Sequence, residues 1–236
     1  MHQSFGKTSN TAFLAVIIEA LKEKWHLVNK EKTVHATLNR SKYQNVHRFE
    51  NSNSPEVFSN FDNKFIISIR NPYTRVLSLY LHVTHSGSTG LSPNWQKKLN
   101  HGEGIISFEK FLNLLSSVGI DNIDGHTFPI STKSLLGEAD YDYVIRFESF
   151  ENDVKEMAKS YFDFDVNVPR KGVRTNSSNN IENHYTDECI DIVRRLYAED
   201  FRVLGYPLDI ELATQLPNLS QNGLRVPDLY IKEILN

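Results

Sequence analysis

The sequence predicts an α/β protein, because two short apolar strands each lead directly into a helical pattern. The first unit covers residues 64–82 and the second covers residues 141–162. The first strand is a β-branched run without polar alternation, which is typical of a strand buried on both faces. With 236 residues, the chain is long enough for one well-buried α/β domain and short for two. We therefore expect a single domain over residues 1–236.

Composition narrows the classes of protein that fit. The formal net charge of −3 gives no general attraction to nucleic acid or to anionic membranes, so an anion site must be a local cluster. The single cysteine, Cys189, excludes an intrachain disulfide and a cysteine-based zinc site, and we expect a packed thiol on a helix. No apolar run approaches the roughly 20 residues that span a bilayer, and no signal peptide is evident. We expect a soluble, cytoplasmic protein without a transmembrane segment.

The first unit places an arginine where its strand ends. Arg70 and Asn71 follow the strand, and Pro72 suits the first position of a helix, where its missing N–H costs nothing. The helix then shows an apolar face of Tyr73, Val76, Leu77, Tyr80 and Leu81, and a polar stripe of Asn71, Arg75, Ser78 and His82. Ligands bind at the carboxyl ends of strands in open α/β sheets. On spacing alone, Arg70 fits a phosphate site and a structural salt bridge equally well.

The whole segment resembles the 3′-phosphate-binding segment of sulfotransferases that use 3′-phosphoadenosine 5′-phosphosulfate (PAPS), and it is most similar to the carbohydrate sulfotransferase branch. The resemblance implies that Arg70 and Ser78 bind the 3′-phosphate of the nucleotide. It also implies a three-layer α/β/α fold with a central parallel sheet, similar to that of P-loop NTPases.

A second anion site is predicted before the apolar helix of residues 12–21. The residues Lys7, Thr8, Ser9, Asn10 and Thr11 form a hydroxyl-rich loop at the helix N-terminus, where backbone N–H groups and the helix dipole favour an anion. A nucleoside triphosphate P-loop would need glycine where Met1 stands. The loop instead resembles the 5′-phosphosulfate loop of sulfotransferases, with Gly6 in place of proline. In that comparison Lys7 also acts in catalysis, by neutralising the departing phosphate.

Two histidines are candidates for the acceptor side of the site. His35 lies in a strand-like run, residues 32–38, and a lone histidine of this kind is more often structural than functional. The sulfotransferase family often has a His-x-Thr segment at this place, whose histidine serves as the catalytic base. His126 begins a loop, residues 126–131, that resembles a His-x-x-Pro-Gln segment near the acceptor, with Ile130 in place of glutamine. We therefore assign His35 as base and His126 to substrate binding.

The remaining segments are predicted as follows. Residues 86–104 read as an exposed loop, and Ser107 caps a helix of residues 107–115. Arg146 and Glu148 are expected to pair and tie their strand to the following helix.

The basic loop of residues 169–178 resembles a nucleotide-covering loop of the family, which implies cofactor binding by Arg170, Lys171, Gly172 and Arg174. Residues 185–206 read as one long helix, whose end resembles the family's closing Tyr-x-x-Asp-Phe-x-x-x-Gly-Tyr.

Together these motifs imply transfer of a sulfuryl group from PAPS to a hydroxyl or amine of a carbohydrate or glycoconjugate. Adenosine 3′,5′-bisphosphate would be the product, and no metal or nucleic acid would take part. Positioning and charge stabilisation suffice for such a transfer. One alternative is a P-loop-type kinase or NTPase that uses ATP and magnesium. Another is a non-catalytic module that binds a nucleotide or a glycan.

Overall fold

The computed structural model describes residues 2–3, 66–85, 91–102, 104–133, 141–163, 165–168 and 181–219. In chain order the elements are β1 (His2–Gln3), β2 (Ile66–Ile69), α3 (Pro72–His85), α4 (Pro93–Lys98), α5 (Phe108–Val118), η2 (Ile120–Asn122), α6 (Ile130–Lys133), β3 (Tyr143–Arg146), η3 (Phe147–Ser149), α7 (Phe150–Phe162), α8 (Asp187–Leu196), α9 (Ala198–Leu204) and η5 (Ile210–Leu212). The predicted helix of residues 12–21 and the predicted strand of residues 32–38 lie outside this part.

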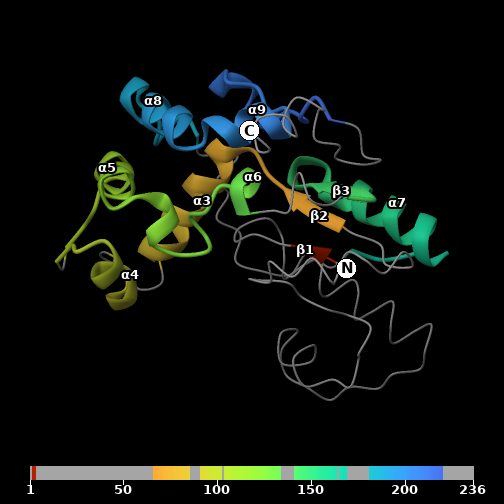
Figure 1. Cartoon of the computed structure of the whole chain (residues 1–236), viewed down its shortest axis with the longest axis horizontal. Coiled ribbons are helices and arrows are strands. Elements are labelled where there is room, and N and C mark those ends of the chain that lie inside the picture. The colour runs from red at the N-terminus through yellow and green to blue at the C-terminus, as the bar shows by residue number, and fades with distance from the viewer. Residues whose placement is uncertain are drawn as a thin grey trace, which may run out of the picture.

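The described strands form one parallel sheet in the order β1-β2-β3 (Figure 1). Gln3 pairs with Ile67, and Ile69 pairs with Arg146. Because the pairing is parallel, the carboxyl ends of the strands meet at one edge. The α/β class is confirmed by this arrangement, whereas the three-layer sandwich remains a prediction.

The two faces of the sheet pack against different helices. Ile67, Ile69 and Val144 belong to a core built with α3, α5, α8 and α9. Their neighbours along the strands, Ile66, Tyr143 and Ile145, belong to a second core built with α7. Figure 1 shows α7 beside β3, on the other side of the sheet from α5 and α8. Since successive strand residues point to opposite faces, both faces are buried, as the apolar run of the first strand predicts.

Several predicted elements are confirmed close to their bounds. The helix after Asn71 begins at Pro72, and the side-chain oxygen of Asn71 accepts a 2.9 Å hydrogen bond from the Tyr73 backbone N–H. Ser107 caps α5 by accepting a bond from the Lys110 N–H at 3.2 Å. Each cap satisfies a backbone donor that the helix itself leaves without a partner. Cys189 is a buried free thiol on α8, as predicted.

The predicted exposed loop of residues 86–104 is wrong in its central part. Helix α4 starts at Pro93, and Leu91, Trp95 and Leu99 are buried in the core. Trp95 and Leu99 lie four residues apart, on one side of a helical turn, and Leu91 precedes them by the same interval. The residues between them are mostly polar, so the segment as a whole has the composition of a loop.

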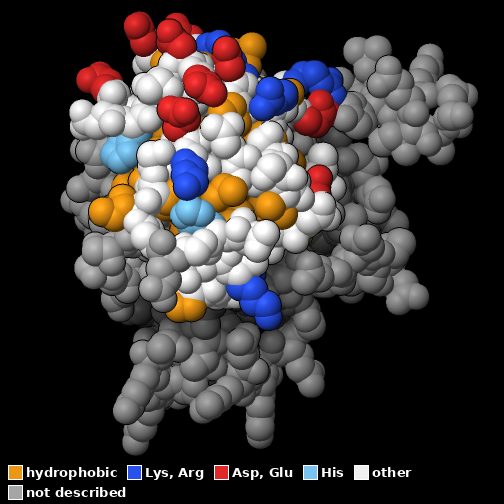
Figure 2. All heavy atoms as spheres, turned by 90° about the vertical axis from the view of Figure 1, so that its left-hand side faces the viewer, with side chains coloured by type: hydrophobic (Ala, Val, Ile, Leu, Met, Phe, Trp, Pro, Cys, Tyr) orange, Lys and Arg blue, Asp and Glu red, His pale blue; other side chains and the backbone are white. Residues whose placement is uncertain are grey.

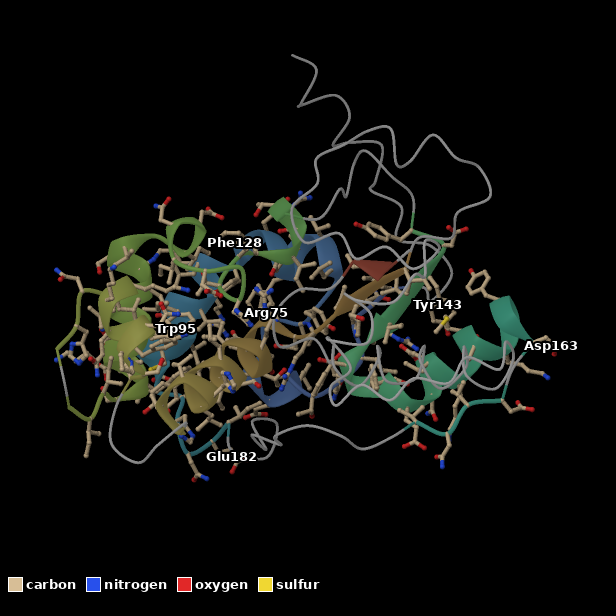
Figure 3. The ribbon with its side chains drawn as sticks, turned by 90° about the horizontal axis from the view of Figure 1, so that it is seen from below. Arg75, Trp95, Phe128, Tyr143, Asp163 and Glu182 are labelled. Atoms are coloured by element: carbon tan, nitrogen blue, oxygen red, sulfur yellow. The ribbon has the colours of Figure 1, made fainter. Side chains whose placement is uncertain are left out.

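The single long helix predicted for residues 185–206 is also wrong. The structure has two helices, α8 and α9, separated by Tyr197, whose φ of −120° and ψ of 26° are not helical. The break redirects the chain so that Asp200 on α9 reaches the first turns of α3. Figure 3 shows Arg75, the α3 residue that Asp200 meets, deep within the molecule.

The part of the chain that the structure describes contains no helix long and apolar enough to cross a membrane. Figure 2 shows the face formed by the helices on the left of Figure 1. On that face, aspartate and glutamate side chains gather in the upper part, and lysine and arginine side chains are spread from the top to the lower edge.

Candidate functional site

Arg70 leaves β2 at the carboxyl edge of the sheet and is only 3% exposed. Its Nε donates a 3.0 Å hydrogen bond to the Thr74 hydroxyl, and its guanidinium carbon lies 3.7 Å from the centre of the Phe147 ring. Burial lowers the pKa of Arg70 to about 10, while the neighbouring Glu148 opposes the shift. The guanidinium therefore remains charged at neutral pH, and two contacts fix its orientation.

Thr74 connects Arg70 to the helix that carries Ser78. The Thr74 hydroxyl accepts from Arg70 and donates to the Asn71 carbonyl at 3.1 Å. Ser78 is buried one turn further along α3, on the same helix face, because residues four apart lie one above the other. Thr74 thus contacts Arg70, and Ser78 follows Thr74 one turn later on the same face of α3. Sequence reasoning missed Thr74 between them, although its spacing of four residues from each was visible.

Asn71 and Glu148 join the ends of β2 and β3. Glu148 accepts a 2.9 Å hydrogen bond from the Asn71 backbone N–H and another of 2.9 Å from the Tyr206 hydroxyl. Burial raises the pKa of Glu148, while these two bonds and the charge of Arg70 oppose the shift. The Asn71 side-chain nitrogen is buried and has no acceptor among the described residues. This edge of the sheet therefore holds a cation, an amide donor and a carboxylate close together.

The pKa of Glu148 leads to a prediction about stability. Because that pKa is raised above its ordinary value of 4.5, the folded state binds more protons than the unfolded state. The contribution of Glu148 to stability should therefore fall as pH rises from about 4.5 through the raised pKa, and should be constant above it. Glu148→Gln should remove this dependence. Urea unfolding of both proteins from pH 4 to pH 8 measures the difference, and an advantage of wild type that grows with pH would contradict the assignment.

Arg146 does not pair with Glu148, which corrects the sequence prediction. Its Nε and Nη2 donate to the two carboxylate oxygens of Asp153 at 2.8 and 2.7 Å. Asp153 also accepts from the Arg146 backbone N–H at 2.8 Å. Asp153 lies in the first turns of α7, so the expected tie between strand and helix exists with another carboxylate. Glu148 instead accepts its hydrogen bond from Asn71, and so links the ends of β2 and β3.

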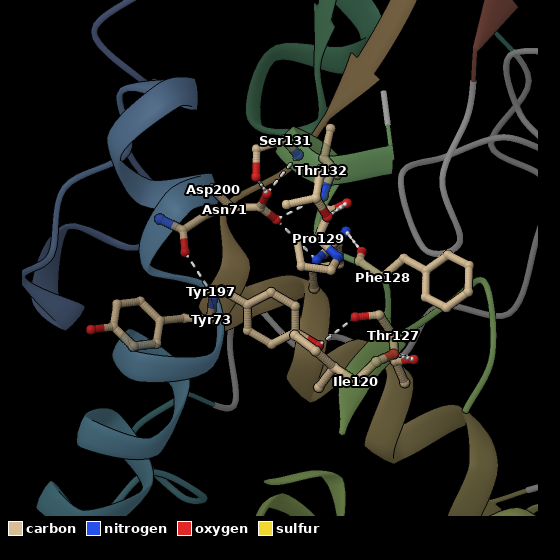
Figure 4. Close-up of polar contacts among 12 residues, drawn as sticks. Asn71, Tyr73, Ile120, Thr127, Phe128, Pro129, Ser131, Thr132, Tyr197 and Asp200 are labelled. Carbon is tan, nitrogen blue, oxygen red and sulfur yellow. Dashed lines mark hydrogen bonds and ion pairs between the residues drawn. The ribbon is translucent and has the colours of Figure 1, made fainter. Parts of the chain in front are cut away.

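A second polar cluster lies beside the first turns of α3. Arg75 donates to the carbonyl of Phe128 at 3.0 Å and to Asp200 at 3.1 Å. Figure 4 shows Asp200 reaching Ser131, and the Tyr197 hydroxyl reaching the carbonyl of Thr127. The family's closing motif, which is residues 197–206 here, supplies both the Asp200 carboxylate and the Tyr197 hydroxyl. Its glycine, Gly205, has a φ of 67°, and a Cβ there would lie 3.1 Å from the carbonyl oxygen of Asn218.

His126 lies on an exposed turn just before this cluster, with 49% of its side chain exposed. Its Nδ1 contacts Asp124, which also pairs with Lys98 of α4. Burial alone would raise the pKa of Asp124, but the bonds from Lys98 and His126 outweigh it and lower the pKa to about 2. The hydrogen bonds of His126 within the described residues go to Asp124, not to Arg70 or Ser78. A ring nitrogen held by a carboxylate has a defined orientation.

The other predicted site residues lie outside the described part of the chain. They are Lys7, Thr8, Ser9, Asn10, Thr11, His35, Arg170, Lys171, Gly172 and Arg174. Their assignments remain predictions.

The geometry defines an α/β protein with a buried cation at the carboxyl edge of a parallel sheet. Comparison with protein-family models matches residues 6–207 to the sulfotransferase family, in the family-2 group that the motifs resemble. This chain therefore belongs to the sulfotransferase family, whose members transfer sulfuryl groups. Comparisons with curated proteins and with solved structures gave no match.

Proposed function

We propose that this protein transfers a sulfuryl group from PAPS to a hydroxyl or amine of a carbohydrate or glycoconjugate. The observation that carries the proposal is the buried, charged and oriented guanidinium of Arg70 at the carboxyl edge of the sheet. A guanidinium binds phosphate oxygens through parallel hydrogen bonds, so Arg70 suits the 3′-phosphate that distinguishes PAPS from ATP. Ser78, on the same face of α3 as Thr74, is the second proposed ligand.

The sheet topology supports a shared donor site. Gln3 ends β1 beside Ile67 of β2, so the chain leaves β1 at the edge at which Arg70 leaves β2. The proposed phosphosulfate ligands, residues 7–11, begin four residues after the end of β1. Lys7 would neutralise the charge that develops on the departing phosphate, and Arg170, Lys171, Gly172 and Arg174 would complete the nucleotide site. We propose that residues 1–236 form one domain and that the transfer proceeds in line, without a metal.

His35 is proposed as the base that removes the proton from the acceptor, since an imidazole can accept a proton near neutral pH. His126 is proposed to bind the acceptor. Its exposure and its contact with Asp124 support this role, because Asp124 fixes the ring while leaving it accessible. The proposal also places the protein in the cytoplasm.

The test compares two nucleotides by calorimetry. We expect adenosine 3′,5′-bisphosphate to bind without metal and much more tightly than ADP with magnesium. Incubation with labelled PAPS and a panel of unsulfated glycans should then transfer label to at least one of them. Preference for ADP with magnesium would favour a kinase or NTPase. Binding of the bisphosphate without transfer to any acceptor would favour a non-catalytic module.

A further inference from the structure

Asp200 is the centre of a buried network that joins three parts of the chain. Its side chain is 0% exposed and accepts hydrogen bonds from four donors. Arg75 of α3 donates at 3.1 Å, the Ile130 N–H at 3.0 Å, and the Ser131 N–H and hydroxyl at 2.8 and 2.7 Å. A buried carboxylate with this many donors is well satisfied, and its partners are fixed in direction.

Asp200 binds Ile130 and Ser131 at one end of a short segment, residues 127–131, and the other end of this segment is also held. The Tyr197 hydroxyl donates to the carbonyl of Thr127 at 2.9 Å, and Arg75 donates to the carbonyl of Phe128 at 3.0 Å. Arg75 is itself 1% exposed and lies 5.0 Å from the centre of the Tyr197 ring. Backbone groups at four of the five positions from Thr127 to Ser131 are thus bound by α3, by α9 or by Tyr197, which precedes α9 (Figure 4).

The location of this segment matters for the reaction. Arg75 is the fourth residue of α3 and lies one residue after Thr74, which holds Arg70. Phe128 and Ser131 are therefore held next to the helix end at which the nucleotide is proposed to bind. The segment also begins directly after the exposed His126. One rigid helix thereby supports both the donor side and the chain that carries His126.

We propose that Arg75, Asp200 and Ser131 are positioning residues, which set the acceptor-facing segment of residues 126–131 relative to the donor held by Arg70. This inference rests on the proposed function. In this inference, the closing motif contributes to catalysis by positioning the acceptor segment. Position matters because sulfuryl transfer depends on the alignment of the acceptor, the sulfur and the leaving oxygen. None of the three residues needs to touch either substrate.

Ser131 offers the mildest test, since its substitution leaves the Arg75–Asp200 pair in place. Ser131→Ala should lower kcat/KM for a glycan acceptor on the order of tenfold, because even a small displacement of the segment costs alignment of the reacting groups. The affinity for adenosine 3′,5′-bisphosphate should stay within about twofold, because the contacts of Arg70 are unchanged. Ser131→Thr keeps a hydroxyl and should restore transfer.

The matched control is Thr132→Ala, which removes the neighbouring hydroxyl. Among the described residues, that hydroxyl has only a local 3.5 Å contact to the carbonyl of Pro129. This variant should behave as wild type. Asp200→Asn should give a larger loss of transfer than Ser131→Ala, and thermal unfolding of each variant shows whether it is folded at the assay temperature.

The assay uses PAPS with an unsulfated glycosaminoglycan and a neutral galactose-terminated oligosaccharide, and follows both label transfer and bisphosphate release. Wild-type transfer with unchanged kcat/KM in folded Ser131→Ala would overturn the inference. Equal losses of transfer and bisphosphate affinity would also overturn it, because they would indicate general disruption. Absence of transfer by the wild type itself would instead reject the proposed function, and the inference with it.

Discussion

Replacing Arg70 with alanine should weaken the binding of adenosine 3′,5′-bisphosphate by about a hundredfold or more, as expected when charge-assisted hydrogen bonds to a phosphate are lost. Arg70 is buried and is oriented by Thr74 and Phe147. Its side chain therefore loses little conformational entropy when the ligand binds. Calorimetry of the wild type and the variant measures the change.

A second ligand separates a direct contact from general damage. AMP lacks the 3′-phosphate, so Arg70→Ala should change AMP affinity far less than bisphosphate affinity. Arg70→Lys keeps the charge but not the two parallel donors, and it should restore only part of the binding. Equal losses for AMP and for the bisphosphate in a folded variant would show that Arg70 does not contact the 3′-phosphate.

Replacing His35 with alanine should lower the rate of sulfuryl transfer by roughly a hundredfold to ten-thousandfold, the usual contribution of a general base. The bisphosphate affinity should be unchanged, because the proposed role of His35 is to take a proton from the acceptor and not to bind the nucleotide. Measured kcat against pH should lose its lower limb in the variant, since no base remains to be deprotonated.

His126→Ala provides the comparison. In the proposed arrangement His126 binds the acceptor, so its loss should raise the KM for the acceptor more than it lowers kcat. If His126→Ala abolished kcat and His35→Ala retained near-normal turnover, the two roles would have to be exchanged. The contact of His126 with Asp124 gives that outcome a structural basis.

The sequence predicted those features that depend on neighbouring residues. Pro72 marks the start of α3, Ser107 caps α5, and α7 covers Phe150–Phe162 as expected, because caps and periodicity are local signals. The strand before Arg70 is predictable because a short, continuous run of β-branched apolar residues is typical of a strand that is buried on both faces. Arg70 and Ser78 were assigned through the resemblance of the whole segment to a family motif.

The features that the sequence did not predict depend on contacts between distant residues. The apolar spacing of Cys189, Ile192, Val193 and Leu196 continues past Tyr197, so nothing local marks the break between α8 and α9. At the break, Tyr197 donates a hydrogen bond to Thr127, and Asp200 accepts one from Arg75, so the residues that favour the break lie far away in the sequence. Arg146 is likewise followed by three acidic residues within seven positions, Glu148, Glu151 and Asp153. Helix α7 brings Asp153 to it, with both carboxylate oxygens in hydrogen-bonding range.

The ion pair of Arg75 and Asp200 spans 125 residues of sequence. During synthesis, a ribosome that has released the chain only as far as Leu196 has produced α3 without its carboxylate partner. Arg75 would then be a buried cation with no counterion, which is costly, so α3 should not dock stably at that stage. The end of the protein at which we propose that the nucleotide binds is encoded early and should therefore mature late. Nascent chains that end before Asp200 should show protease sensitivity around α3.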